Sequence, residues 1–172
     1  MFLSEAESVA RLFGRNAVAV HHIGSTAVPG LCSKPIIDML MEVFDIESVD
    51  AMNDLMSVRG YLPRGESGIG GRRFFIKGTE TVRTHHLHLF ECGHKRIADH
   101  LAFRDYLFAH PGEAAEYGRL KHDLAISHRY DIEGYMAGKD GFIGVLIGKA
   151  HAWMRATGGG IAAACDAISG DA

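Results

Sequence analysis

The stretch Gly24-Ser25-Thr26-Ala27-Val28-Pro29-Gly30, followed by Pro35-Ile36-Ile37-Asp38-Met39-Leu40-Met41, decides the fold of this chain. An apolar run over 17–20 leads into the Gly-Ser turn, and a second apolar run after it carries one carboxylate, Asp38. A buried carboxylate is costly unless it has a partner. A Gly-Ser turn exposes backbone N–H groups that suit a phosphate. Together these features predict a site that handles a metal and a phosphate compound.

Length and composition predict an ordinary globular protein. The 172 residues are enough for one domain with a real core, which we place at 1–157, with a flexible tail over 158–172. The contents of hydrophobic residues, 47%, and charged residues, 23%, fit that class. A formal net charge of −3 gives no signal for nucleic acid, and no apolar run is long enough to cross a bilayer.

The cysteines and histidines point in different directions. Cys32, Cys92 and Cys165 form no CxxC pair, so neither a zinc ribbon nor a disulfide framework is expected. Their odd number suits a reducing compartment, and we expect a cytoplasmic location because no signal peptide is visible. Several of the 11 histidines gather in two short segments, 21–22 and 85–88, which makes them candidates for a site.

The hydrophobic pattern predicts a front half of strands and helices and a helical back half. Strands are expected over 17–23, 35–43, 74–76 and 84–91. Helices are expected over 4–13, 45–60, 97–109, 112–128, 132–137 and 143–155. Strands followed by a run of helices favour an α+β fold, with a mixed sheet of about three to five strands flanked by helices.

Longer motifs around the turn resemble the GrpB family. They are His22-Ile23-Gly24-Ser25-Thr26-Ala27-Val28-Pro29-Gly30-Leu31 with Lys34-Pro35-Ile36-Ile37-Asp38, Arg83-Thr84-His85-His86-Leu87-His88-Leu89-Phe90-Glu91, Leu101-Ala102-Phe103-Arg104-Asp105-Tyr106-Leu107 with His110-Pro111, and Glu116-Tyr117 with Leu120-Lys121. The resemblance runs from Ser4 to Gly148. It implies a single nucleotidyltransferase-like domain over 1–157, in a family whose function is largely uncharacterised.

Nucleotidyltransferases of this type carry a Gly-Ser turn and then two carboxylates one residue apart, which hold two divalent ions. Gly24-Ser25 matches the turn, and Asp38 matches one carboxylate. Ile36 and Leu40 stand where the second carboxylate is expected. Glu42 lies two pleats along the strand, about 13 Å from Asp38, which is too far to share an ion. The likeness to the superfamily is therefore incomplete.

Such enzymes often carry a third carboxylate on a later strand, and His86 or His88 takes that place here. His86 and His88 share one face of the later strand, about 6–7 Å apart, so both imidazoles can reach one ion. One Asp and two His are typical of a single site for a softer divalent ion. We expect Asp38, His86 and His88 to hold Mg, Mn or Zn, with Asp38 also catalytic and no organic cofactor. His22, beside the turn, is a further candidate.

The phosphate-binding residues expected from the turn and from nearby cations are Gly24, Ser25, Thr26, Lys34, Arg83 and Lys121. Structural alternatives stay open at this point. Asp38 can instead pair with Arg83 or Lys34, the histidines can be ordinary hydrogen-bonded side chains, and Lys121 can lie on a solvated helix face. Arg72 and Arg73 are expected on a surface loop.

Three functions remain open on the sequence. The first is transfer of a nucleotidyl group to an unknown acceptor. The second is a catalytically degenerate nucleotide-binding or regulatory module, and the third is metal-dependent hydrolysis of a phosphoester. In each case the expected partner is a nucleotide or another phosphorylated small molecule, with no membrane or nucleic-acid partner. The base, the metal and the oligomeric state do not follow from the residues.

Overall fold

Five strands form one mixed sheet in the order β1-β2-β5-β4-β3. A computed structural model describes residues 2–31 and 33–158 of the chain. The strands are β1 (Ala17–Ile23), β2 (Ile37–Val43), β3 (Tyr61–Pro63), β4 (Arg72–Gly78) and β5 (Arg83–Glu91). The central pair, β2 and β5, is parallel, and every other neighbouring pair is antiparallel. The α+β class predicted from the sequence is confirmed.

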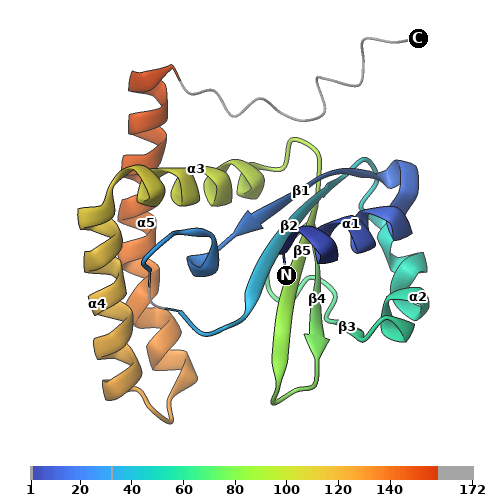
Figure 1. The fold of residues 1–172 in the computed structure, drawn as a ribbon, viewed down its shortest axis with the longest axis horizontal. Helices are drawn as coiled ribbons and strands as arrows, with labels where there is room; N and C mark the ends of the chain where they lie inside the picture. The colour runs from blue at the N-terminus through green and yellow to red at the C-terminus, as the bar shows by residue number, and fades with distance from the viewer. Residues whose placement is uncertain (1, 32, 159–172) are drawn as a thin grey trace.

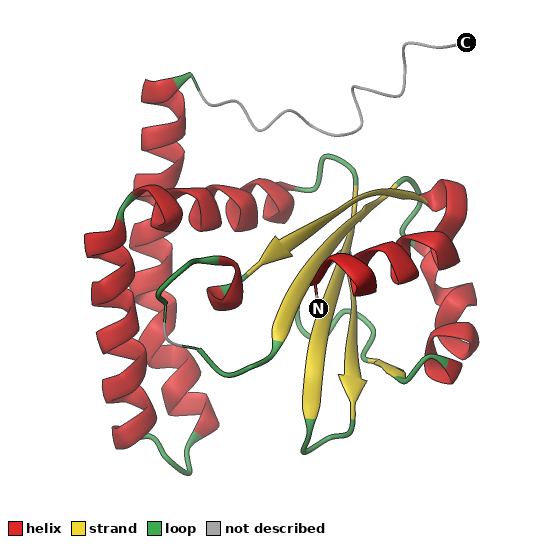
Figure 2. Ribbon diagram, in the orientation of Figure 1, coloured by secondary structure: helices red, strands yellow, loops and turns green. Residues whose placement is uncertain are grey.

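Helices cover the sheet from both sides (Figures 1 and 2). One side carries α1 (Phe2–Phe13) and α2 (Asn53–Val58), and the other carries α3 (Lys95–Ala109), α4 (Pro111–Ser127) and α5 (Ile132–Thr157). Three short 3-10 helices, η1 (Gly14–Asn16), η2 (Ser25–Ala27) and η3 (Glu47–Met52), connect the larger elements. The helical C-terminal half is confirmed as well.

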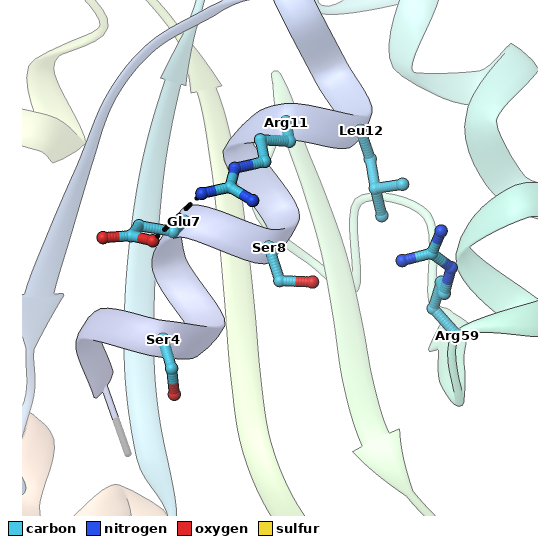
Figure 3. Close-up of a pocket in the computed structure, with 6 residues that line it drawn as sticks. All are labelled: Ser4, Glu7, Ser8, Arg11, Leu12 and Arg59. Carbon is cyan, nitrogen blue, oxygen red and sulfur yellow. Dashed lines mark hydrogen bonds and ion pairs between the residues drawn. The ribbon is translucent and has the colours of Figure 1, made fainter.

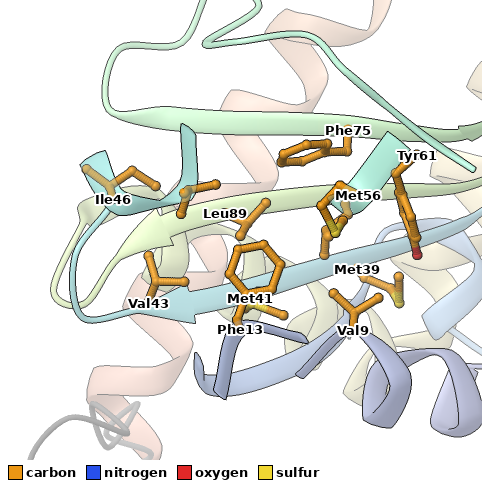
Figure 4. Packing of buried hydrophobic residues seen from close by; sticks show 12 residues of the cluster. Val9, Phe13, Met39, Met41, Val43, Ile46, Met56, Tyr61, Phe75 and Leu89 are labelled. Carbon is orange, nitrogen blue, oxygen red and sulfur yellow. The ribbon is translucent and has the colours of Figure 1, made fainter. Parts of the chain in front are cut away.

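The main core lies between the sheet and the α1–α2 side. Alternation along β2 and β5 turns Met39, Met41, Leu87 and Leu89 toward this side, where all four are fully buried. Figure 4 shows these strands packed against Val9 and Phe13 of α1 and against side chains from η3 and α2. Apolar side chains cover this face of the sheet, so the polar residues at the alternate positions of β2 and β5 lie on the other face.

The opposite face is only partly apolar. Its buried cluster joins β1, β2, β5 and α3 through Ile23, Leu40, Phe90, Ile97 and Leu101. A separate core holds α3, α4 and α5 together, and η2 is fastened to it by Val28. The rest of the sheet face carries Asp38, His86 and His88 between these two clusters, as the alternation predicted.

Three elements differ from the prediction. The single helix expected over 45–60 is divided into the 3-10 helix η3 and the short α-helix α2. The short strand β3 was not expected, because its three residues include Pro63 and give no alternating pattern. The back of the chain forms one helix of 26 residues, α5, where two helices were expected. The glycines of this segment indicate a helix end in the sequence. Gly138 lies against Leu124 of α4, however, and this packing outweighs the low helix propensity of glycine.

Other expectations fare unequally. Gly158 ends α5 in the left-handed conformation, and the rest of the predicted tail lies outside the described residues. Cys92 is disulfide-bonded, which corrects the expectation that the cysteines stay unpaired and removes their argument for a reducing compartment. None of the helices described is both long and apolar enough to cross a membrane.

Candidate functional site

Asp38 and His86 meet at the centre of the open sheet face. The parallel register of β2 and β5 sets them side by side, and the Nδ1 of His86 lies 2.9 Å from the Oδ1 of Asp38. The predicted partners Lys34 and Arg83 are therefore not the partners of this carboxylate. The Nε2 of His86 is buried and has no hydrogen-bond partner in the part of the chain that the structure describes. Asp38 orients the ring, and the second nitrogen has no hydrogen-bond partner within the described residues.

Gly24 lies directly over the Asp38 carboxylate. The glycine has φ 69° and ψ −167°, a conformation that L side chains avoid. A Cβ built on it would come within 2.5 Å of Asp38 Oδ2. The prediction that the turn and the carboxylate form one site is thus consistent with their close approach. Position 24 therefore requires glycine both for its backbone conformation and for its close approach to Asp38.

Lys121 connects the helical half to the turn. Its Nζ donates to the Oγ of Ser25 at 2.8 Å, although 96 residues separate the two in the sequence. The ammonium also lies 4.9 Å from the centre of the Tyr117 ring. Burial, with Tyr135, Asp38 and Asp140 nearby, raises the pKa of Tyr117 to about 12, so this side chain stays neutral. Lys121 is accordingly not on a solvated helix face.

Lys139 of α5 is a site residue that the sequence reasoning missed. It is half-buried and lies over the ring of Tyr135, at 4.8 Å. Burial lowers its pKa, the charges of Asp140 and Asp38 oppose this effect, and Lys34 reinforces it. No ion pair or hydrogen bond holds its ammonium among residues 2–31 and 33–158. The sequence does contain a signal for this position. Lys139 lies at helical spacing from the core residues Phe142, Leu146 and Ala150, which places it on the same face of the helix.

His88 is directed toward cations and not toward Asp38. Its Nδ1 lies 3.3 Å from the Nη1 of Arg72, and its ring is 5.7 Å from that of His100. Burial, followed by the charges of His100 and Arg72, holds the pKa of His88 well below its usual range. Arg72 was expected on a surface loop, but it lies on β4 and is only 7% exposed.

The donor set fits the expected metal poorly. Asp38 and His86 are bonded to each other, and His88 faces a guanidinium, which repels a cation. Within the described ranges, no group of three or more His, Cys, Asp or Glu side chains is arranged to hold an ion. Metal binding by Asp38, His86 and His88 stays a prediction from the sequence.

The remaining candidates lie at or outside the edge of this cluster. His22 projects from the other side of β1, stacked on Phe2 at 4.7 Å, and its Nε2 lies 3.0 Å from the Oγ1 of Thr26. Thr26 thereby anchors the turn. Arg83 is exposed and pairs with Glu80 at 3.8 Å in the β4–β5 turn, so it does not approach Asp38. Lys34 is exposed and lies near enough to Lys139 to influence its pKa.

A surface pocket lies away from this cluster, between α1 and the end of α2 (Figure 3). It is lined by Ser4, Glu7, Ser8, Arg11, Leu12 and Arg59, and the Glu7–Arg11 ion pair spans one turn of the helix. Five of its six side chains are exposed, and none belongs to the predicted site. The pocket therefore does not compete with the Asp38 cluster as the candidate site.

A family model described as GrpB protein matches residues 1–149. UPF0157 protein YqkA of Bacillus subtilis is 47% identical over 154 residues, which cover 90% of this chain and 45% of that protein. UPF0157 protein PA4798 of Pseudomonas aeruginosa is 36% identical over 157 residues, covering 90% and 64%. The chain thus spans less than two thirds of the length of both proteins.

Two further comparisons cover most of both chains. The glutamate-rich protein GrpB of Alkalihalophilus pseudofirmus is 31% identical over 153 residues, covering 87% of this chain and 88% of that protein. The crystal structure of the conserved protein GrpB from Enterococcus faecalis superposes with a TM-score of 0.82 at 43% identity, covering 87% of this chain and 89% of that one. The sheet and the helical half are thus shared with a solved structure.

Proposed function

Because the chain belongs to the GrpB family, as its motifs predicted, we propose that it binds a phosphorylated small molecule, such as a nucleotide, beside the Gly24–Ser25 turn. The observation that carries this proposal is the contact between Lys121 and Ser25. It brings together a turn suited to phosphate and a cation that the sequence predicted separately. Their meeting needs an explanation beyond packing.

Lys139 adds a second cation with a reason to bind an anion. A half-buried ammonium without an ion pair has lost hydration, and in the described chain its contact with the Tyr135 ring replaces only part of it. A phosphate group between Lys139 and the turn restores that interaction and brings a charge that both lysines attract. Tyr117 and Tyr135 supply flat apolar walls for these ammonium groups.

The Asp38–His86 pair favours a catalytic version of the same proposal. A carboxylate that accepts from Nδ1–H leaves Nε2 as a proton acceptor, which is the arrangement of a general base. On this view His86 removes a proton from an attacking hydroxyl or water, and Asp38 stabilises the imidazolium. A metal ion held near Asp38 would neutralise phosphate charge, as the sequence likeness to nucleotidyltransferases implies. Binding without turnover is the alternative.

Titration calorimetry with ATP, ADP and AMP tests the binding proposal, with and without Mg²⁺, Mn²⁺ or Zn²⁺. Lys121→Gln and Lys139→Gln are expected to weaken binding about tenfold each, as for the loss of a charged hydrogen bond. Arg119→Gln is the matched control, because Arg119 is exposed on the same helix as Lys121 and carries the same charge. Equal affinities in all three variants, or no binding by the wild type, would overturn the proposal.

Turnover separates the enzyme from the binding module. Release of pyrophosphate from a nucleoside triphosphate indicates nucleotidyl transfer, and release of phosphate alone indicates hydrolysis. Loss of either activity in His86→Gln, with nucleotide affinity kept, supports the role of His86 as the base. Binding by the wild type with neither product assigns the chain to the non-catalytic alternative.

A further inference from the structure

We propose a second oxyanion site on the same sheet face, formed by Arg72 of β4 with Arg96 and His100 of α3. This site is distinct from the Ser25–Lys121 contact and does not depend on it. Arg72 and His88 lie near the end of the open face that is next to α3. His88 is two residues further along β5 than His86, which contacts Asp38. The class of ligand is a phosphate or a phosphate monoester.

Arg72 is a buried cation without a carboxylate. Its guanidinium donates to the carbonyl oxygens of Glu66 and Ser67 at 3.0 and 2.7 Å and lies 3.3 Å from the Nδ1 of His88. All three acceptors are neutral, and the other neighbour is the ring of Phe74, at 4.9 Å. Each of the three nitrogens has a hydrogen-bond partner, but the charge itself remains uncompensated, which is costly in a buried position.

The first turns of α3 add one cation, Arg96, whose charge acts on Arg72, and one imidazole, His100, whose pKa is lowered by burial. Arg96 and His100 are four residues apart and share one helix face, and the His100 ring lies against those of His88 and Phe90. The first turn of α3 contains no acidic residue, although a helix N-terminus favours acids over cations. No hydrogen bond or ion pair engages the Arg96 side chain among the described residues.

The two carboxylates whose charge acts on His100, Asp99 and Asp38, have other partners, and that of Asp38 is His86. Asp99 holds His151 of α5, with Oδ1 at 2.8 Å from Nε2. Glu66 accepts from the backbone N–H of Gly71 at 2.7 Å. The cluster therefore has two charged guanidinium groups beside two neutral imidazoles, and no counter-charge is bonded to the guanidinium groups within the described chain. A bound oxyanion supplies that charge and accepts from Arg96 and His100 without displacing the contacts of Arg72.

The test follows inorganic phosphate by NMR, since amide shifts locate the binding. Titration into the full chain is expected to shift the amides of Gly71, Arg72 and the first turn of α3. Calorimetry on Arg96→Gln is expected to show affinity at this site lowered at least about tenfold. Lys95→Gln is the matched control, because Lys95 is the exposed neighbour with the same charge in the same turn.

To keep the two proposals apart, the calorimetry is repeated in a Lys139→Gln background, where the site at the turn is weakened. Arg72 is left intact, because its loss would release the loop it holds, while His100→Gln gives an independent second variant. Amide shifts confined to the turn, or equal affinities for Arg96→Gln and Lys95→Gln, would overturn the second site. Failure of nucleotide to bind at Lys121 and Lys139 would leave it unaffected.

Discussion

The Cα of Gly24 lies so close to the Asp38 carboxylate that a methyl group on it would reach within 2.5 Å of Oδ2. Gly24→Ala therefore suffers both a steric clash and a strained φ. We expect it to lower the free energy of unfolding by at least about 2 kcal/mol. Gly30→Ala is the control, because Gly30 also has positive φ but has nothing within 4 Å of its Cβ position. Urea unfolding that gives equal losses for the two variants would show that the clash is relieved at no cost.

Alanine substitutions at three glycines of α5 are expected to change stability by different amounts. Gly141 and Gly144 have open space around their Cβ positions, whereas a Cβ on Gly138 would come within 2.5 Å of Leu124. Gly141→Ala and Gly144→Ala are expected to raise the free energy of unfolding by up to about 1 kcal/mol each, through higher helix propensity. Gly138→Ala is expected to show no such gain. A gain at Gly138 matching the other two in urea unfolding would mean that α4 and α5 separate freely.

Glu5 of α1 bonds to Lys77 and Tyr61 of the sheet, and we expect this contact to be lost in acid, with a loss of stability. Burial favours the neutral form of Glu5, but hydrogen bonds from Lys77 and Tyr61 outweigh it and lower the pKa of this carboxyl. A carboxyl group whose pKa is depressed by folding stabilises the folded state at pH values above its pKa in the unfolded chain. That stability is lost as the pH falls through the lower pKa of the folded state. Glu5→Gln should flatten the fall in stability below about pH 4.5 by on the order of 1 kcal/mol.

Chemical denaturation at several pH values makes this measurement. Glu7→Gln is the matched control, since Glu7 is exposed on the same helix and pairs only with exposed Arg11. A Glu7→Gln profile as flat as that of Glu5→Gln would assign the pH dependence to general charge.

Removal of His21, on the edge strand β1, is expected to destabilise the protein because of its contact with Glu42. This carboxylate is 3% exposed, and its Oε1 lies 2.7 Å from the Nε2 of His21. His21→Ala leaves a buried charge without its partner, and we expect a loss of about 3 kcal/mol. Adding Glu42→Gln should restore part of it, whereas His122→Ala on the exposed face of α4 should have little effect. Strict additivity in a double-mutant cycle would contradict direct coupling of the pair.

The sequence predicted the parts of the site that depend on local pattern. The bounds of β1 and, within two residues, of β2 and β5, the alternation of His86 with Leu87, and the turn before Asp38 all followed from short-range rules. The likeness to the GrpB family joined them into one face. The direct partner of Asp38 was not foreseen, because three basic side chains were available and only the β2–β5 register selects His86.

Residues that act through tertiary packing were harder to predict. Arg72 follows several glycines, which suggested an exposed loop, yet the strand begins there and buries the guanidinium against His88. Lys139 lies in a glycine-rich segment that resembled a break between helices. Its burial arises because α5 continues unbroken past α4. Both cations lie next to glycines, which favour loops in a sequence pattern, whereas a strand begins at Arg72 and a helix runs through Lys139.

The wide sequence separation across the site has a consequence for the ligand proposed to bind there. The Asp38–His86 contact closes a loop of 48 residues, and the Lys121–Ser25 contact closes one of 96. Each forms only after distant segments have found one another, so no fragment or partly folded chain contains the complete site. A ligand bound there recognises the fully assembled chain alone. It would therefore protect the whole molecule from global unfolding and from the proteolysis that follows, in proportion to its concentration.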